Sequence, residues 1–152
     1  MTADAPEVPG SPGEPGALGK LAYLYVGTDD VDRDRAFYLQ ALGAAPVWRF
    51  QAFATDVAAV RLGPGAPLVL LAEHRPAPSC LPIWTVPDLD AAIARLAASG
   101  FESNGETAGT PDGPVHVLRD PSGNEVGLLQ QDRPDALEAA FADPDHENAV
   151  RE

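Results

Sequence analysis

The sequence repeats itself at an offset of 58 residues, and this repeat limits the folds open to the chain more than any other feature. RLGPGAPLVLL, which begins at Arg61, aligns without a gap on RDPSGNEVGLL, which begins at Arg119. At the same offset DVD from Asp30 aligns on DLD from Asp88. Because these landmarks keep the same order and spacing, they indicate two copies of one structural module.

Each copy predicts one strand, one helix and three further strands. The first strand is expected at 21–27 in the first copy and at 81–86 in the second. Asp30 and Asp88 then act as helix N-caps, and each helix ends near a glycine. The later strands are expected at 45–53, 56–62 and 67–73, and at 101–107, 113–119 and 124–131. The sequence therefore predicts an α+β fold of two tandem βαβββ modules.

The repeat also sets the expected domain boundaries. One domain is expected at 19–131, with module one at 20–73, a proline-containing linker at 74–80 and module two at 81–131. Residues 1–18 are rich in Pro and Gly and are expected to be disordered. Residues 132–152 are expected to form an acidic tail, with a short helix around Asp135–Ala142 and a frayed end.

Composition excludes several partners. The net charge of −13 argues against binding to nucleic acid or to an anionic membrane surface. No window approaches the length of a membrane span, and MTADAPEVPG lacks the features of a signal peptide. Cys80 is the single cysteine, so we expect a cytoplasmic chain without an internal disulfide. Residues 19–131 hold 13 acidic and 8 basic residues, which modestly favours a cationic ligand.

The motifs DVDRDRAFYLQALGA and DPSGNEVGLLQ resemble the vicinal oxygen chelate superfamily over roughly Lys20 to Gln131. That superfamily includes glyoxalases, extradiol dioxygenases, fosfomycin-modifying enzymes and bleomycin-binding resistance proteins. The resemblance implies that each module curls into a half-barrel and that the two modules enclose a cleft. Short members similar to bleomycin resistance proteins commonly dimerise, so the resemblance also implies a homodimer.

Enzymes of this superfamily usually take one metal ligand from the first strand and one from the last strand of each module. Carried over by motif spacing, these positions are Tyr23, Val69, Leu81 and Gly127. Three of them offer no side-chain donor, and a lone tyrosine holds a metal poorly. We therefore expect no metal and no cofactor. We interpret Gly127 as space gained where an ion was lost, with a simple β-bulge as the alternative.

Strand alternation predicts the lining of the cleft. Tyr23 and Tyr25 share one strand face, and Trp48 and Phe50 share another. Arg49 alternates with these aromatic residues and is expected at the surface or at an interface. A cleft lined by apolar and aromatic groups is typical of a small-molecule site. The residues expected to bind the ligand are Tyr23, Tyr25, Trp48, Phe50, Val69, Leu71, Leu81, Ile83, His116 and Gly127.

Three functional hypotheses follow. The first is a metal-free protein that sequesters a hydrophobic or aromatic compound, as in antibiotic resistance by drug binding. The second is a glyoxalase- or dioxygenase-like metalloenzyme with displaced ligands at Glu73, His74 and His116, or a cofactor-free isomerase built on Tyr23 or His116. The third is a protein-interaction module whose aromatic cleft is a dimer interface.

His116 is open to a second interpretation, as a packed histidine facing the helix. The motifs identify no catalytic base, nucleophile or Lewis acid, which favours binding.

Overall fold

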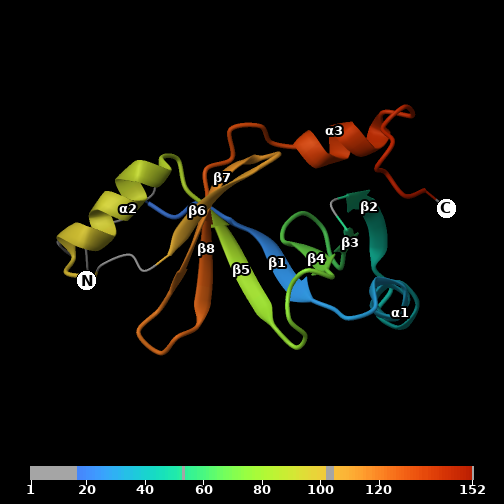
Figure 1. Cartoon of the computed structure of the whole chain (residues 1–152), viewed down its shortest axis with the longest axis horizontal. Helices are drawn as coiled ribbons and strands as arrows, with labels where there is room; N and C mark the ends of the chain where they lie inside the picture. The colour runs from blue at the N-terminus through green and yellow to red at the C-terminus, as the bar shows by residue number, and fades with distance from the viewer. Residues whose placement is uncertain (1–16, 53, 102–104, 152) are drawn as a thin grey trace, which may run out of the picture.

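The computed structural model describes residues 17–52, 54–101 and 105–151, so most of the N-terminal segment predicted to be disordered lies outside it. The described elements follow the order βαβββ twice and end in a third helix (Figure 1). Module one contains β1 (Leu21–Gly27), α1 (Val31–Ala36), the π-helical η1 (Phe37–Ala41), β2 (Ala45–Ala52), β3 (Thr55–Arg61) and β4 (Leu68–Ala72). Module two contains β5 (Cys80–Thr85), α2 (Leu89–Ala98), β6 (Glu106–Thr110), β7 (Gly113–Arg119) and β8 (Glu125–Leu129), and α3 (Ala136–Ala142) follows.

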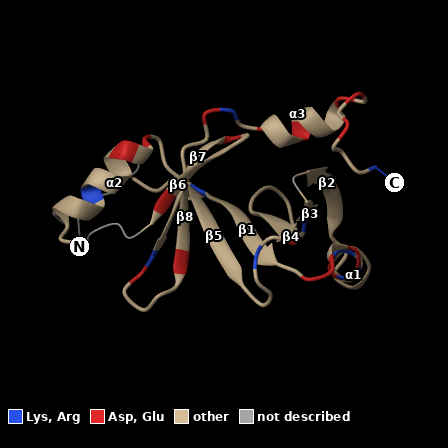
Figure 2. Ribbon diagram, viewed as in Figure 1, with Lys and Arg blue, Asp and Glu red and all other residues tan. Residues whose placement is uncertain are grey.

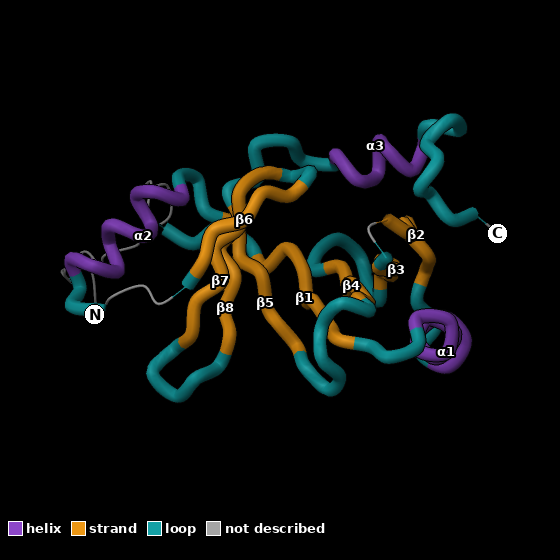
Figure 3. The backbone as a smooth tube through the Cα atoms, in the orientation of Figure 1, coloured by secondary structure: helices purple, strands orange, loops and turns teal. Residues whose placement is uncertain are grey.

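The eight strands form a curled sheet in the order β2-β3-β4-β1-β5-β8-β7-β6 (Figure 3). Within each module the first and last strands pair in parallel, β1 with β4 and β5 with β8. The modules join where β1 and β5 pair antiparallel at the centre of the sheet. The predicted α+β architecture of two βαβββ modules forming a half-barrel is confirmed.

The helices α1 and α2 pack on the outer face of this sheet. Both begin at the predicted caps, since Asp30 accepts from the Arg33 amide and Asp88 accepts from the Ala91 amide, each at 3.0 Å. Apolar clusters join η1 to β3 and β4, and α2 to β8. The concave face of the sheet is therefore not covered by α1 or α2. Among the described residues, no helix is long and apolar enough to cross a membrane.

The hairpin loops of the two modules differ by one residue. In both loops an arginine guanidinium donates to the carbonyl of a glycine four residues later, Arg61 to Gly65 and Arg119 to Gly123. From that glycine to the next strand there are two residues in module one, but only Asn124 in module two. The ungapped alignment of these segments is therefore wrong beyond Gly65.

This extra residue changes which side chains of β4 correspond to those of β8. Ala59 pairs with Leu70 in module one, and its counterpart Val117 pairs with Gly127 in module two. Leu70, and not Val69, is thus the structural counterpart of Gly127. A slip of one residue moves a side chain to the opposite face of the sheet.

The C-terminal segment packs against the edge of β2. The Gln51 amide donates to the Asn148 carbonyl, and the Val150 amide donates to the Arg49 carbonyl, both at 2.9 Å. The expectation of a frayed end is wrong for described residues 143–151, because the exposed edge of β2 supplies hydrogen-bond partners. Figure 1 shows α3 beside β2, and this chain end next to it. The start of β6 also differs from the prediction, since the strand begins at Glu106.

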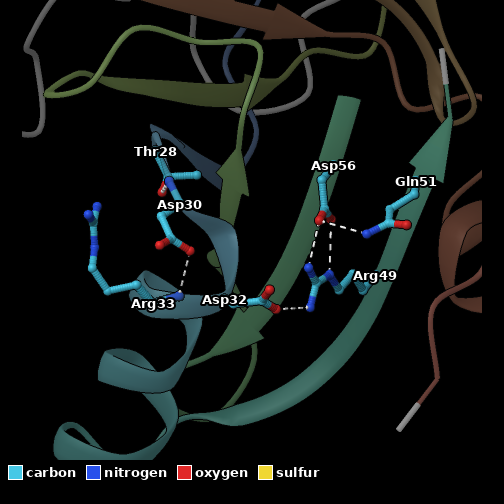
Figure 4. A network of polar contacts seen from close by, with 7 residues as sticks. All are labelled: Thr28, Asp30, Asp32, Arg33, Arg49, Gln51 and Asp56. Atoms are coloured by element: carbon cyan, nitrogen blue, oxygen red, sulfur yellow. Dashed lines mark hydrogen bonds and ion pairs between the residues drawn. The ribbon is translucent and has the colours of Figure 1, made fainter. Parts of the chain in front are cut away.

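Arg49 is at the centre of an ion-pair network (Figure 4). Its Nε lies 3.0 Å from Asp56 Oδ1, its Nη2 2.6 Å from Asp56 Oδ2, and its Nη1 2.7 Å from Asp32 Oδ1. Its side chain is 11% exposed, so the prediction of a surface position is wrong, and the alternative of an interface position stays a prediction. Burial acts to raise the pKa of Asp56, but hydrogen bonds from Arg49 and Gln51 outweigh it and hold this pKa below its usual value. The network ties α1, β2 and β3 together.

Candidate functional site

The concave face of the sheet holds a cavity of about 690 Å³, which is within the usual size range of small-molecule sites. The strands at its centre carry no charge: β1, β4 and β5 have neither acidic nor basic residues (Figure 2). Their side chains face the cavity in alternation, which gives it an apolar wall. The predicted residues that line it are Tyr23, Tyr25, Trp48, Phe50, Leu81 and Ile83. Ligand binding by these residues stays a prediction.

Val69 and Leu71 were expected in the cleft, and this placement is wrong. Both side chains belong to the cluster under η1, with Val60 and Tyr38. The cause is the extra residue in the β3–β4 loop, which inverts the alternation along β4. Leu70 takes the place on the cavity wall instead.

His116 also lies outside the cavity. Its neighbours along β7, Val115 and Val117, line the cavity, so the imidazole faces the opposite side of the sheet. It is 5% exposed, and its Nδ1 lies 2.8 Å from Thr107 Oγ1. Burial lowers the pKa of His116. The prediction that His116 lines the ligand site is wrong, and its second interpretation as a packed, hydrogen-bonded histidine fits the structure.

Gly127 faces the concave side, but it does not open space for a guest. It pairs with Ile83 on the neighbouring strand. A Cβ at position 127 would lie 2.9 Å from Ile83 Cγ1, closer than real Cβ contacts. The interpretation of Gly127 as added cavity space is therefore wrong, because the Ile83 side chain already fills that space.

A group of polar side chains lies beside Tyr25. The Tyr25 hydroxyl is 3.0 Å from His74 Nε2, and His74 Nδ1 is 3.0 Å from Thr55 Oγ1. Arg75 lies over the Tyr25 ring at 5.7 Å and forms an ion pair with Glu125 at 2.6 Å. Burial, and then the charge of Arg75, lower the pKa of His74, which favours the neutral imidazole at physiological pH.

A second polar pair lies beside Tyr23. The Tyr23 hydroxyl donates to Asp112 Oδ2 at 2.5 Å, from the wall of the cavity. Burial and this hydrogen bond raise the pKa of Tyr23, so its hydroxyl stays protonated. Asp112 precedes β7 in the turn that follows β6, and it is 2% exposed. Sequence reasoning missed this residue, because a turn aspartate is ordinarily a solvated one.

The C-terminal segment supplies another wall that sequence reasoning missed. The lining residues from this segment are Leu137, Ala140, His146 and Asn148. The Phe50 ring meets Phe141 at 5.9 Å and His146 at 5.3 Å, both edge to face. A signal was present, because Leu137 and Phe141 are four residues apart and share one face of a helix whose other residues are alanines and Glu138.

A comparison with protein families settles the relationship of this chain. The family model described as Glyoxalase/Bleomycin resistance protein/Dioxygenase superfamily matches residues 20–128. The chain belongs to this superfamily. A comparison with curated proteins gives no match.

Solved structures share the fold of this glyoxalase superfamily member. Methylmalonyl-CoA epimerase from Mycobacterium tuberculosis is 16% identical with a TM-score of 0.64, and the match covers 76% of this chain and 90% of that one. A hypothetical protein, BH1468 from Bacillus halodurans, is 13% identical with a TM-score of 0.63, covering 75% and 95%. A Streptomyces coelicolor methylmalonyl-CoA epimerase variant is 15% identical with a TM-score of 0.62, covering 77% and 100%. Likeness at this level of identity concerns the fold alone.

The residues of this superfamily member do not fit a chelated divalent metal. With the register corrected, the four ligand positions are Tyr23, Leu70, Leu81 and Gly127, and the Tyr23 hydroxyl already donates to Asp112. Leucine and glycine side chains offer no donor. The described part of the chain brings no three His, Cys, Asp or Glu residues together as a metal site. The two histidines of the metalloenzyme hypothesis are also separated from each other. His74 contacts Tyr25, whereas His116 lies on the other face of the sheet.

Proposed function

We propose that this glyoxalase superfamily member is a metal-independent binding protein that sequesters a hydrophobic or aromatic compound. One observation carries the proposal: where superfamily enzymes place metal ligands, this cavity presents a hydrogen-bonded tyrosine, two leucines and a glycine covered by Ile83. Such a surface supports burial of an apolar guest. It offers no chelation of vicinal oxygens.

The free energy of burying aromatic surface in this cavity is sufficient for binding. Burying an aromatic surface of about 150–250 Å² at roughly 25 cal/mol per Å² contributes several kcal/mol before ordering costs. Two such contacts allow affinity on the order of micromolar. Trp48 and Phe50, whose ring centroids are 5.4 Å apart, form one aromatic wall, and Tyr23 and Tyr25 form another.

Sequestration without turnover would protect a cell from a toxic compound, so drug binding is the role that we propose. The cytoplasmic location and the homodimer stay predictions. The interaction-module hypothesis predicts a different result: such a module would self-associate and show no response to small aromatic molecules.

Calorimetric titration with acridine, a flat neutral probe at slightly alkaline pH, tests the proposal. The chain is first dialysed against EDTA, and metal content is measured. We expect saturable binding without added metal, weakened by Phe50→Ala and unchanged by Phe37→Ala, whose ring is exposed and outside the cavity. Absence of binding, or binding that appears only after a divalent metal is added, would contradict the proposal.

The hydrogen bond from Tyr23 to Asp112 favours a second candidate, a cofactor-free isomerase. A buried carboxylate beside a protonated hydroxyl could exchange a proton with a bound substrate. Methylmalonyl-CoA, named for the structural neighbours, is a suitable test compound. Epimerisation in the presence of EDTA that is lost in Asp112→Asn would favour this candidate over simple binding.

A further inference from the structure

We infer that Asp112 is the anchor for a positively charged nitrogen, and that the guest is a flat aromatic compound carrying a protonated amine. This inference rests on the proposed function, because it specifies the chemistry of the molecule that the cavity takes. It is carried by an unpaired carboxylate oxygen inside an apolar cavity.

The two oxygens of Asp112 are used unequally. Oδ2 accepts from the Tyr23 hydroxyl at 2.5 Å and from Gln131 Nε2 at 3.4 Å. Oδ1 is buried and has no hydrogen-bond partner among the described residues. Buried polar atoms in native proteins nearly always have a partner, and an unpaired charged acceptor is especially costly. Asp112 lines the cavity but Oδ1 itself is covered, so the carboxylate must turn toward a guest before the guest can supply the missing N–H donor.

Two further acidic residues lie near this carboxylate, and the nearby arginine is held by backbone carbonyls. Asp135 and Glu138, next to and within α3, lie close enough for their charges to act on the Tyr23 hydroxyl. Arg133 directs its guanidinium to the carbonyls of Thr110 and Pro111. These three acidic residues and one arginine give the Tyr23 end of the cavity a net negative charge, to which a cation is complementary.

Other cationic groups at the cavity are already committed. Arg75 pairs with Glu125 at 2.6 Å, and burial favours the neutral form of His74. Neither group neutralises Asp112. A protonated amine next to Asp112 would also lie near the Tyr23 ring, whose face attracts cations. A neutral guest of equal shape that has no N–H or O–H group, such as acridine, would leave Oδ1 without a partner.

Three acridines of similar shape test the inference on the full chain. 9-Aminoacridine is cationic, acridine is neutral and acridine-9-carboxylate is anionic at slightly alkaline pH. We expect the cation to bind at least about tenfold more tightly than acridine, and the anion to bind least, because hydrogen bonds to charged groups are strong. Asp112→Asn should remove most of the preference for the cation. Asp90→Asn removes an equal charge from the exposed first turn of α2 and should preserve the preference.

The outcomes separate the inference from the proposed function. Equal affinity for 9-aminoacridine and acridine in the unmodified chain would overturn the inference and leave the proposed function in place. The same holds if folded Asp112→Asn keeps the full preference. Binding of none of the three probes would overturn both. If Asp112→Asn does not fold, Tyr23→Phe serves instead. This variant keeps the Asp112 carboxylate, so it must keep the preference for the cation. Loss of that preference would overturn the assignment of Asp112 as the anchor.

Discussion

The Ile83 side chain occupies the space that a side chain at position 127 would need. The two residues pair on adjacent parallel strands, and a Cβ on Gly127 would lie 2.9 Å from Ile83 Cγ1. The glycine and the isoleucine are therefore a complementary pair. Position 127, where superfamily enzymes carry a metal ligand, is here closed by a hydrocarbon side chain.

Gly127→Ala should destabilise the chain by about 1–3 kcal/mol, because the new methyl group overpacks against Ile83. In an Ile83→Ala background the same substitution should cost less, since Cγ1 is gone. Gly109→Ala is the matched control, because a Cβ there meets no atom within 4 Å. Urea unfolding measures all four variants. An equal cost of Gly127→Ala in both backgrounds would show that the two residues do not compete for space.

Two aspartates that contact Arg49 should differ in their contribution to stability. Asp56→Ala should cost about 3 kcal/mol or more, because both side chains of the pair are about nine-tenths buried and a largely buried guanidinium is left behind. Asp32→Ala should cost less than about 1 kcal/mol, because the Asp32 side chain is 81% exposed. The urea unfolding midpoints of the two variants give the comparison. Similar costs for the two variants would mean that burial does not determine the strength of this network.

Stability should fall as the pH drops below about 6.5, because folding lowers the pKa of His116 and of His74. The unfolded chain then binds more protons than the folded chain, so the stabilisation present above that pH is lost as the pH falls through the folded pKa values. His116→Gln should flatten the change in thermal midpoint between about pH 8 and pH 5, and adding His74→Gln should flatten it further. Carboxylates with lowered pKa values, such as Asp56, lose their contribution only at lower pH. An unchanged slope in the double variant would rule out the histidines as the cause.

Leu137→Ala should weaken binding of 9-aminoacridine by up to about tenfold, because Leu137 lines the cavity from α3. Leu42→Ala is the matched control, since Leu42 is 50% exposed and outside the cavity. Calorimetry on the full chain measures both. If both variants bind as tightly as the parent chain, the C-terminal segment is not part of the binding surface.

Local patterns in the sequence predicted most of the fold. Helix caps at Asp30 and Asp88 and the strand runs depend on neighbouring residues, so they can be identified without tertiary information. The two tyrosines of β1 were also placed correctly, because alternation from a well-defined strand start fixes the face of each residue.

The errors have a common physical origin in register. An insertion of one residue after Gly65 keeps the repeat visible but inverts the alternation in β4, which moved Val69 and Leu71 into the predicted cleft. Asp112 and the C-terminal wall have a different cause. Asp112 is placed by its contact with Tyr23, a residue far away in the chain. The apolar face of α3 is visible in the sequence, but the strand against which it packs, β2, is not.

Tryptophan emission tests the central claim most directly, because the two tryptophans lie on opposite faces of the sheet. Trp48 lines the cavity and is 4% exposed, whereas Trp84 packs in the cluster under α2. In Trp84→Phe, with EDTA present, titration with 9-aminoacridine should quench Trp48 emission saturably, and the matched Trp48→Phe variant should show no saturable change. An unresponsive Trp48, or a response that requires added divalent metal, would contradict the account of a metal-independent binding cavity.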